Sequence, residues 1–353
     1  MSERNISGIQ QIGVGVSNLK EAWKWYRQNF GMDIKIFEEE AIAELMLPHT
    51  EGKTRKRHAV LAFNMHGGGG FEVWQHTERT PMAAIYNIEI GDLGIFAGKM
   101  KTKDIHKSFQ FFKEKNLEIL TEISKDPAGQ LHFFMKDPYN NVFQFVEEKS
   151  YFRKDKSFNG GTYGAIIGVT NIDKSLVVYK DILGYDEVLY DGIDVFTDLS
   201  GLAGGKNKFR RVILKHSKPR LGSFSPMLGP TQIELMQVHD KQPRQIFEGR
   251  IWGDLGFIHL CFDITGMNNL RSYCESKGFP FTVDSANSFD MGEAAGHFSY
   301  IADPDGTLIE FVETHKIPVI KKLGWYINLQ KRNPLKPLPN FILKSLRFNR
   351  IKD

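Results

Sequence analysis

The sequence predicts an α+β protein made of four βαβββ modules, each with a strand, an amphipathic helix and three further strands. Internal repetition is the first reason, because IGDLGIFA at 90–97 returns as WGDLGFIH at 252–259 and FEVWQ at 71–75 returns as IELMQ at 233–237. DPYNNVFQFVE at 137–147 also returns, as DPDGTLIEFVE at 303–313. Helix start and stop signals at matching places in each quarter are the second reason.

The first and third quarters have the clearest start signals. Residues 9–16 alternate as a strand, Asn18 can cap the next helix with Glu21 at the capping-box position, and Gly31 ends the apolar helical spacing. The third quarter repeats this plan, with a strand at 165–169, a cap at Asn171 and a helix that runs to a stop at Gly184.

The second and fourth quarters have predicted helices at 104–115 and 266–277, which end at Asn116 and Gly278. Asn and Gly both tolerate the left-handed conformation that ends many helices. The segments 137–141 and 303–307 are turn signals before apolar strands. The glycine run 66–70 predicts a flexible hairpin before a further apolar strand. That run lacks a following Lys-Ser/Thr, so we do not interpret it as a phosphate loop.

Composition predicts an ordinary globular protein. The chain has 353 residues, enough for two domains, with 41% hydrophobic and 25% charged residues. No apolar run approaches the ~18 residues of a transmembrane helix, and the polar start does not resemble a signal peptide. Two cysteines give no disulfide framework. We therefore expect a cytoplasmic protein.

The C-terminal segment 316–353 is basic and contains four prolines. It has ten Lys and Arg against one acid, Asp353, whereas the rest of the chain is slightly acidic. Its aromatic and aliphatic residues can pack down, so we interpret it as an extension that wraps over the body or over a second subunit. A homodimer through this extension is one expectation, and no nucleic-acid partner is expected.

The four modules resemble the vicinal oxygen chelate superfamily, which includes glyoxalases, methylmalonyl-CoA epimerases, bleomycin-resistance proteins and extradiol dioxygenases. The resemblance covers about residues 9–313, through VSNL at 16–19 and DPDG at 303–306 before a Glu-bearing strand. It implies two incomplete, cup-shaped barrels. The expected domains are 1–150 (modules 9–76 and 90–147), with a degenerate site, 151–315 (modules 162–238 and 253–313), with a metal site, and the extension 316–353.

In that family two modules surround one divalent metal, and each supplies a ligand from its first and its last strand. The resemblance maps these positions, in module order, onto Gln11, Ala97, Gly164 and His259 for the first strands and Glu72, Gln144, Glu234 and Glu310 for the last strands. Ala97 and Gly164 carry no ligand atom, and Gln144 is a weak candidate. A carboxylate such as Glu310 inside an apolar strand needs a metal, a cation or hydrogen-bond donors.

Two pairings of modules are open. Neighbour pairing, which we favour slightly, gives His259, Glu310 and Glu234 in modules three and four. Pairing of module one with module four gives Gln11, Glu72, His259 and Glu310, an order similar to that of eukaryotic-type glyoxalases. His259 and Glu310 belong to the site under both. Cys261 is expected to be core packing, and His297 is a reserve ligand.

The resemblance and these ligands predict an enzyme of the lyase, isomerase or epimerase type, although a non-enzymatic role stays open. Its metal would be Zn, Ni, Co, Mn or Fe(II), and its substrate a small molecule chelated through two adjacent oxygens. Glu310 or Glu234 would carry a proton from carbon beside a carbonyl. The first alternative is an Fe(II) ring-cleaving or 2-oxo-acid dioxygenase, which would need a second histidine such as His297 or His216. The second alternative is a metal-free binding or resistance protein.

Overall fold

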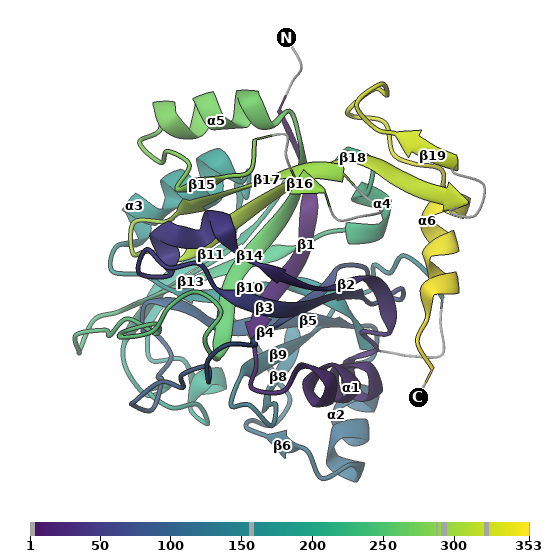
Figure 1. The fold of residues 1–353 in the computed structure, drawn as a ribbon. Coiled ribbons are helices and arrows are strands. Elements are labelled where there is room, and N and C mark those ends of the chain that lie inside the picture. The colour runs from purple at the N-terminus through teal and green to yellow at the C-terminus, as the bar shows by residue number, and fades with distance from the viewer. Residues whose placement is uncertain (1–3, 155–158, 287–288, 291–294, 321–324, 353) are drawn as a thin grey trace.

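The computed structural model describes residues 4–154, 159–286, 289–290, 295–320 and 325–352. Within these residues the chain forms two curled sheets of ten and nine strands, with few helices (Figure 1). This is the α+β fold that the sequence predicts.

Sheet A has the strand order β15-β17-β18-β14-β1-β4-β3-β2, with β16 beside β17 and β19 beside β18. Its strands are β1 (Asn5–Gly15), β2 (Ile34–Ile42), β3 (Lys56–Phe63), β4 (Gly70–His76), β14 (Gly256–Thr265), β15 (Val283–Asp284), β16 (Phe289–Asp290), β17 (Ala295–Ala302), β18 (Leu308–Ile320) and β19 (Trp325–Asn328).

Sheet B has the order β11-β12-β13-β10-β5-β9-β8-β6, with β7 beside β8. Its strands are β5 (Gly94–Thr102), β6 (Glu118–Ile119), β7 (Ser124–Lys125), β8 (Leu131–Lys136), β9 (Val142–Glu147), β10 (Asn159–Gly168), β11 (Glu187–Asp194), β12 (Phe209–Lys215) and β13 (Gln232–Val238).

The strand order corrects the favoured pairing of neighbouring modules. β1 of module one runs antiparallel to β14 of module four, and β5 of module two runs antiparallel to β10 of module three. Figure 1 shows purple β1 along green β14 at the middle of sheet A. Module one therefore pairs with module four and module two with module three, so each sheet takes one module from each half of the sequence.

The predicted helix boundaries are confirmed. The helices are α1 (Leu19–Phe30), α2 (Ile105–Glu114), α3 (Ile172–Leu176) with a π-helical continuation (Val177–Ile182), α4 (Ser225–Leu228), α5 (Met267–Ser276) and α6 (Asn340–Ser345), with 3₁₀ turns at Glu44–His49, Thr197–Leu199 and Leu346–Asn349. The Asn18 and Asn171 side chains accept hydrogen bonds from the first turns of α1 and α3. Gly31, Asn116, Gly184 and Gly278 all have positive φ after the helices that they end.

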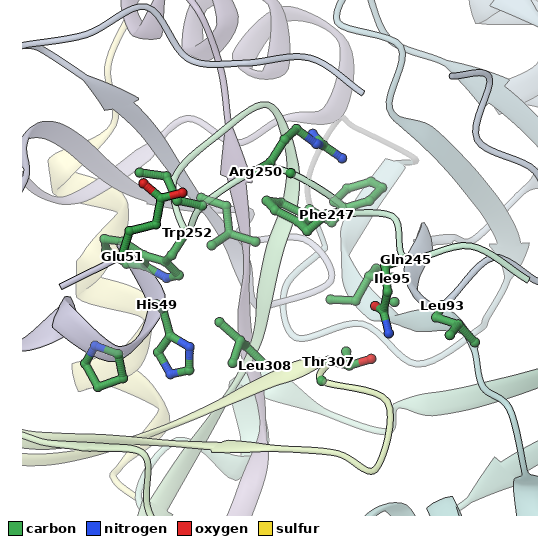
Figure 2. Close-up of a pocket in the computed structure, with 17 residues that line it drawn as sticks. His49, Glu51, Leu93, Ile95, Gln245, Phe247, Arg250, Trp252, Thr307 and Leu308 are labelled. Carbon is green, nitrogen blue, oxygen red and sulfur yellow. The ribbon is translucent and has the colours of Figure 1, made fainter. Parts of the chain in front are cut away.

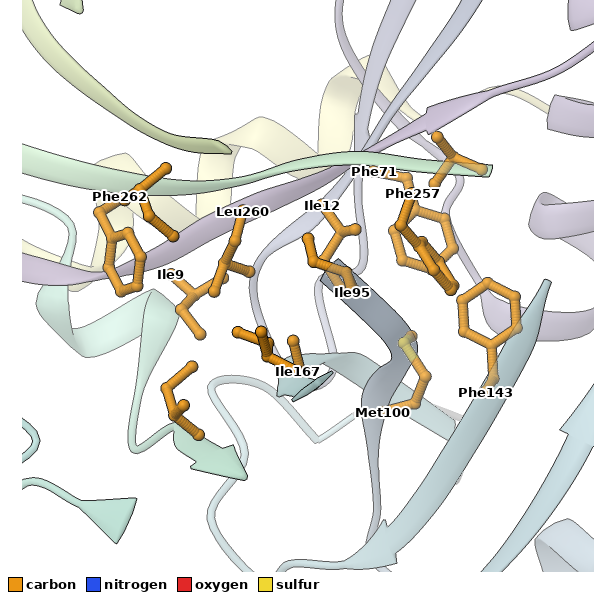
Figure 3. Packing of buried hydrophobic residues seen from close by; sticks show 14 of the residues in the cluster. Ile9, Ile12, Phe71, Ile95, Met100, Phe143, Ile167, Phe257, Leu260 and Phe262 are labelled. Atoms are coloured by element: carbon orange, nitrogen blue, oxygen red, sulfur yellow. The ribbon is translucent and has the colours of Figure 1, made fainter. Parts of the chain in front are cut away.

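The main core lies between the two sheets (Figure 3). Ile12 and Leu260 of sheet A share it with Met100, Phe143 and Ile167 of sheet B. Because this shared core occupies one face of sheet A, the functional candidates must use the other, concave face. β-Strands alternate their side chains between faces, so Phe71 and Val73 enter the core while Glu72 and Trp74 lie on the concave face.

The repeated Gly-Asp-Leu-Gly motif organises the crossings between the sheets. Asp92 accepts hydrogen bonds from the backbone N–H groups of Glu89 and Arg244, and Asp254 accepts them from those of Ile251 and Met82. Each aspartate thus holds its own loop and the matching loop of the other half. The glycines of both copies have φ between 90° and 121°, so this motif is structural.

The glycine run 66–70 forms the predicted hairpin loop between β3 and β4, and its glycines meet neighbouring backbone. A Cβ on Gly68 would lie 1.6 Å from the carbonyl oxygen of Met227, and one on Gly161 would lie 1.4 Å from that of Gly68. Only glycine permits chains to cross at this separation. Close backbone packing explains the run.

The C-terminal extension packs on the body beside sheet A. Leu338 and Leu343 are buried with Leu61 and Phe63 of β3. The end of the extension reaches β2, where the Ile351 N–H donates to the Asp33 carbonyl oxygen at 2.9 Å. The extension therefore connects the module-four end of sheet A to its module-one edge. None of the helices in the described residues has the length and apolar character needed to cross a membrane.

Candidate metal centre

Four predicted ligand positions meet on the concave face of sheet A: Gln11 on β1, Glu72 on β4, His259 on β14 and Glu310 on β18. His259 Nε2 lies 3.1 Å from Glu310 Oε2 and 3.4 Å from Glu72 Oε2. Gln11 Nε2 lies 3.4 Å from Glu310 Oε2. Among the described residues, Glu72, His259 and Glu310 form the one group of three His, Cys, Asp or Glu ligand atoms within 4.8 Å of one another.

Two β-bulges turn the first-strand positions toward the site. Gln10 is the extra residue between the pairs Ile9–Phe262 and Gln11–Cys261, and Ile258 is the extra residue between the pairs Gly13–His259 and Val14–Phe257. A bulge shifts the alternation of side chains by one residue and can thereby redirect a side chain. Each bulge residue directly precedes a candidate ligand, so modules one and four orient their first-strand ligands in the same way.

Gly13 makes room for the His259 imidazole. The two residues are opposite each other in the β1–β14 ladder, and a Cβ on Gly13 would lie 2.5 Å from the ring carbon Cε1. His259 is fully buried, so its ring has little space into which to move.

Gly13→Ala is expected to lower the free energy of unfolding by about 1–3 kcal/mol, because the added methyl must displace a buried ring. Urea denaturation checks this. The control is Gly98→Ala in β5, where the nearest contacts are side-chain atoms at 3.1–3.2 Å. Equal stability of Gly13→Ala and the wild type would contradict the tight contact.

Tyr300 orients the carboxylate of Glu310. Its hydroxyl donates to Glu310 Oε1 at 2.8 Å and lies 3.5 Å from His259 Nδ1. Tyr300 is opposite Glu310 in the β17–β18 ladder and is buried. Sequence reasoning did not identify this tyrosine as a partner of Glu310. Its exact pairing with Glu310 depends on the strand register, which the repeat does not encode.

Burial and mutual charge shift the proton affinities of the group. Burial raises the pKa of Glu72 to about 7, and the nearby charge of Glu310 adds to this rise. Burial opposes ionisation of His259, but the charge of Glu310 outweighs it and raises the His259 pKa. Burial likewise disfavours the charged Glu310, but His259 lowers its pKa overall. Two carboxylates held this closely favour a positive charge between them.

The donor set fits a divalent metal. It offers one imidazole nitrogen, two carboxylates and one amide oxygen, which suit Zn, Ni, Co, Mn or Fe(II). Gln11 Oε1 is buried and has no hydrogen-bond partner, and the buried His259 Nε2 faces the carboxylates of Glu72 and Glu310. Buried polar atoms without partners are costly unless something else satisfies them, and both atoms are of kinds that ligate metals.

The corresponding positions of sheet B hold a buried ion-pair network. Glu234 Oε2 lies 2.6 Å from Lys99 Nζ, and its Oε1 accepts from Arg211 Nε at 2.7 Å. Arg211 also binds Asp198, which lies 3.1 Å from His132 Nε2. Burial would raise the pKa of Glu234, but Arg211 and Lys99 hold it at about 2.

The structure therefore does not bring Glu234 to His259 and Glu310, because β13 belongs to sheet B. Lys99 is the residue that the sequence reasoning missed. It is opposite Gln144 in the β5–β9 ladder, as Cys261 is opposite Glu310 in the β14–β18 ladder. A lysine two residues after Ala97, directly after the uncharged run 94–98, was the available signal.

The reserve histidines lie elsewhere. His297 Nε2 lies 2.5 Å from Asp284 Oδ1. His216 Nδ1 lies 2.8 Å from the Lys218 carbonyl oxygen, near sheet B. Cys261 is buried beside Glu310, and burial raises the pKa of its thiol well above the usual range. Within the described residues, the group on sheet A thus has a single histidine.

A pocket of about 500 Å³ lies beside the group. Figure 2 shows His49, Glu51, Trp252 and Leu308 around it. Its wall includes Ile258, the neighbour of His259, but none of the four candidate ligands. The cluster of Met46, Trp74, Trp252, Ile258 and Tyr300 packs at this side of the concave face. The pocket therefore borders the group without opening directly onto it.

The sequence and the fold of this chain are similar to those of known proteins. The family model of the Glyoxalase/Bleomycin resistance protein/Dioxygenase superfamily matches residues 8–145 and 164–311. Glyoxalase I from Zea mays is similar in structure, with a TM-score of 0.54 and 13% identity over 98% of this chain and 96% of that one. A proposed dioxygenase from Bacillus subtilis gives a TM-score of 0.58 and 13% identity over 99% and 98%. No curated protein sequence matches the chain.

Proposed function

Since the chain belongs to the Glyoxalase/Bleomycin resistance protein/Dioxygenase superfamily, we propose that it is a metal-dependent enzyme whose site lies on the concave face of sheet A. Gln11, Glu72, His259 and Glu310 would hold one divalent metal. The observation that carries this proposal is the convergence of two carboxylates and one imidazole, with ligand atoms within 4.8 Å, on a buried face. The buried Gln11 Oε1, which has no hydrogen-bond partner, supports it.

The proposed reaction is proton abstraction beside a carbonyl, in a small substrate with two adjacent oxygens. The bound metal would supply Lewis-acid chemistry that stabilises developing negative charge. Glu310 is the proposed proton carrier, because its carboxylate is within the group and is held by the Tyr300 hydroxyl. Glu234, the other candidate from the sequence, is instead held between Lys99 and Arg211.

The remaining residues would hold the two sides of the site in position and shield it from water. Gln11 and Glu72 fix the module-one side of the site, and His259 fixes the module-four side. The buried aromatic side chains of Trp74 and Trp252 limit the access of water to this face. Exclusion of water strengthens the electrostatic effect of every fixed charge near the reacting atoms.

Metal analysis tests this proposal. Protein purified without a tag or chelator is expected to contain about one divalent ion per chain, and His259→Ala is expected to lose it. His297→Ala is the matched control and should retain the metal, because His297 pairs with Asp284. Wild-type protein that neither contains a divalent ion nor takes one up would contradict the proposal and favour a metal-free binding protein.

Oxygen uptake tests the dioxygenase alternative. No oxygen consumption is expected with catechols or 2-oxo acids, because iron dioxygenases of this fold use a set of two histidines and one carboxylate. The group on sheet A offers one histidine, two glutamates and a glutamine. Steady oxygen uptake that disappears in His259→Ala would replace the lyase or isomerase proposal with the dioxygenase.

A further inference from the structure

A second pocket, of about 550 Å³, lies away from the candidate metal centre. It is lined by α4, the segment 215–221, the segment 150–152 and Pro337 of the C-terminal extension. The backbone of Gly67 and Gly229 forms part of its wall. None of Gln11, Glu72, His259 and Glu310 lines it. Its volume is within the ~300–1,000 Å³ of small-molecule sites.

Lys101 places a buried ammonium at the wall of this pocket. Only 2% of the residue is exposed, and its Nζ donates to the carbonyl oxygens of Gly67 and Leu228, both at 3.0 Å. No ion pair between Lys101 and a carboxylate occurs among the described residues. An ammonium has three donors, so these two bonds leave one unused. Burial lowers the pKa of Lys101 to about 8, and the charge of Glu148 offsets part of this effect.

Gly229 leaves space next to this ammonium. A Cβ at Gly229 would lie 3.2 Å from Lys101 Nζ, and among the described residues other than the two chain neighbours of Gly229 no other atom lies within 4 Å of that position. Gly229 also lines the pocket. The space beside the ammonium is therefore continuous with the wall of the cavity.

Three more basic side chains line the same pocket: Lys215, Lys218 and Arg220. The guanidinium of Arg220 lies over the Tyr185 ring at 5.1 Å, and its buried Nε has no hydrogen-bond partner. Glu187 is the single acid among the lining residues of the described chain. Glu148 and Asp186 act on Lys101 and Arg220 from outside the lining, but the wall itself has four basic side chains against one acid. This excess of positive charge favours an anionic occupant.

The rest of the wall is apolar, with Phe152, Met227 and several prolines. We propose that this pocket binds a small organic anion, with a phosphate or carboxylate group beside Lys101 and an aromatic or short aliphatic body against the apolar wall. The Lys101 ammonium is the anchoring contact. Arg220, Lys215 and Lys218 supply the surrounding positive charge.

Isothermal titration calorimetry with the full chain tests the pocket, with phenyl phosphate and benzoate as probes. At least one of the two is expected to bind more tightly than inorganic phosphate, which lacks the aromatic body, and than benzyl alcohol, which lacks the anionic group. Lys101→Met is expected to weaken that probe at least tenfold. Lys113→Met, at an exposed lysine of α2, is the control and should bind as the wild type does.

A second variant keeps the proposal testable if Lys101→Met does not fold. Lys218→Glu changes an exposed residue at the rim and is expected to weaken the probe at least threefold, whereas Lys113→Glu should not. His259→Ala should retain binding, which separates this pocket from the metal centre. Three results would overturn the proposal. They are loss of binding in His259→Ala, equal binding in Lys218→Glu and Lys113→Glu, and no binding of either probe.

Discussion

Lys99→Met is expected to lower the free energy of unfolding by about 3–5 kcal/mol, the cost of removing one partner of a buried ion pair. The Lys99 and Glu234 side chains are both completely buried, at 2.6 Å from each other. Without Lys99, Arg211 is the one ion-pair partner left to Glu234 in the described part of the chain, and Arg211 also neutralises Asp198. Urea denaturation at pH 7 measures the loss.

The surface pair Lys35–Glu38 provides the control. Its atoms are 3.0 Å apart, but the side chains are 37% and 31% exposed, so Lys35→Met should change stability by less than ~1 kcal/mol. The double variant Lys99→Met/Glu234→Gln should be more stable than Lys99→Met, because it no longer buries the uncompensated charge. A Lys99→Met protein as stable as the Lys35→Met protein would show that the network is not essential to sheet B.

The same pair predicts a loss of stability in acid. The pKa of Glu234 is about 2 in the folded protein against an ordinary value of 4.5, so its ionised form stabilises the fold above pH 4.5. That contribution is lost as the pH falls from 4.5 toward 2. Denaturation at a series of pH values should show a shallower decline over this window in Lys99→Met/Glu234→Gln. An unchanged slope would assign acid unfolding to other groups.

Glu310→Gln is expected to slow proton abstraction by about 10²–10⁴-fold, the usual contribution of a positioned general base. Proton NMR in D₂O can follow exchange of the hydrogen beside the carbonyl in a set of small hydroxyketones. Tyr300→Phe removes the hydroxyl that holds Glu310 and should cause a smaller loss. Because Tyr300 acts through Glu310, its loss should be largely absent in the Glu310→Gln background.

Glu313→Gln is the matched control on the same strand. The Glu313 carboxylate accepts the backbone N–H of Gly266 before α5, so this variant should exchange at the wild-type rate. Metal content measured on the same samples separates loss of the proton carrier from loss of the metal. Exchange at the wild-type rate in Glu310→Gln would remove Glu310 from the proposed role.

The repeat in the sequence predicted the modules, their helices and the position of each last-strand glutamate. Local signals carry this information, since the Asn18 cap and the Gly31 stop each act within one turn of a helix. The repeat also marked His259 and Glu310, because every ligand position has a counterpart to compare. These predictions depended on residues close together in the sequence or on the alignment of the copies.

The pairing of modules was not predictable in this way. The loops that carry Asp92 and Asp254 are equivalent, so neither their length nor their composition favours one partner module. The choice depends on which strand lies beside β1, and it is made by contacts such as Asp92 with Arg244 and Asp254 with Met82 across the molecule. The role of Lys99 was missed for a related reason, because its partner Glu234 is on a strand of another module.

Pairing of module one with module four has a consequence for the order of events during synthesis. Glu72 and His259 are separated by 187 residues, the difference of their numbers. At ~5–20 residues per second a ribosome needs on the order of ten seconds or more to make that stretch. Modules two and three are completed within this interval and can form sheet B first. The proposed metal centre can then assemble only after β14 and β18 have been made, so a chain truncated before β14 should contain sheet B without the site.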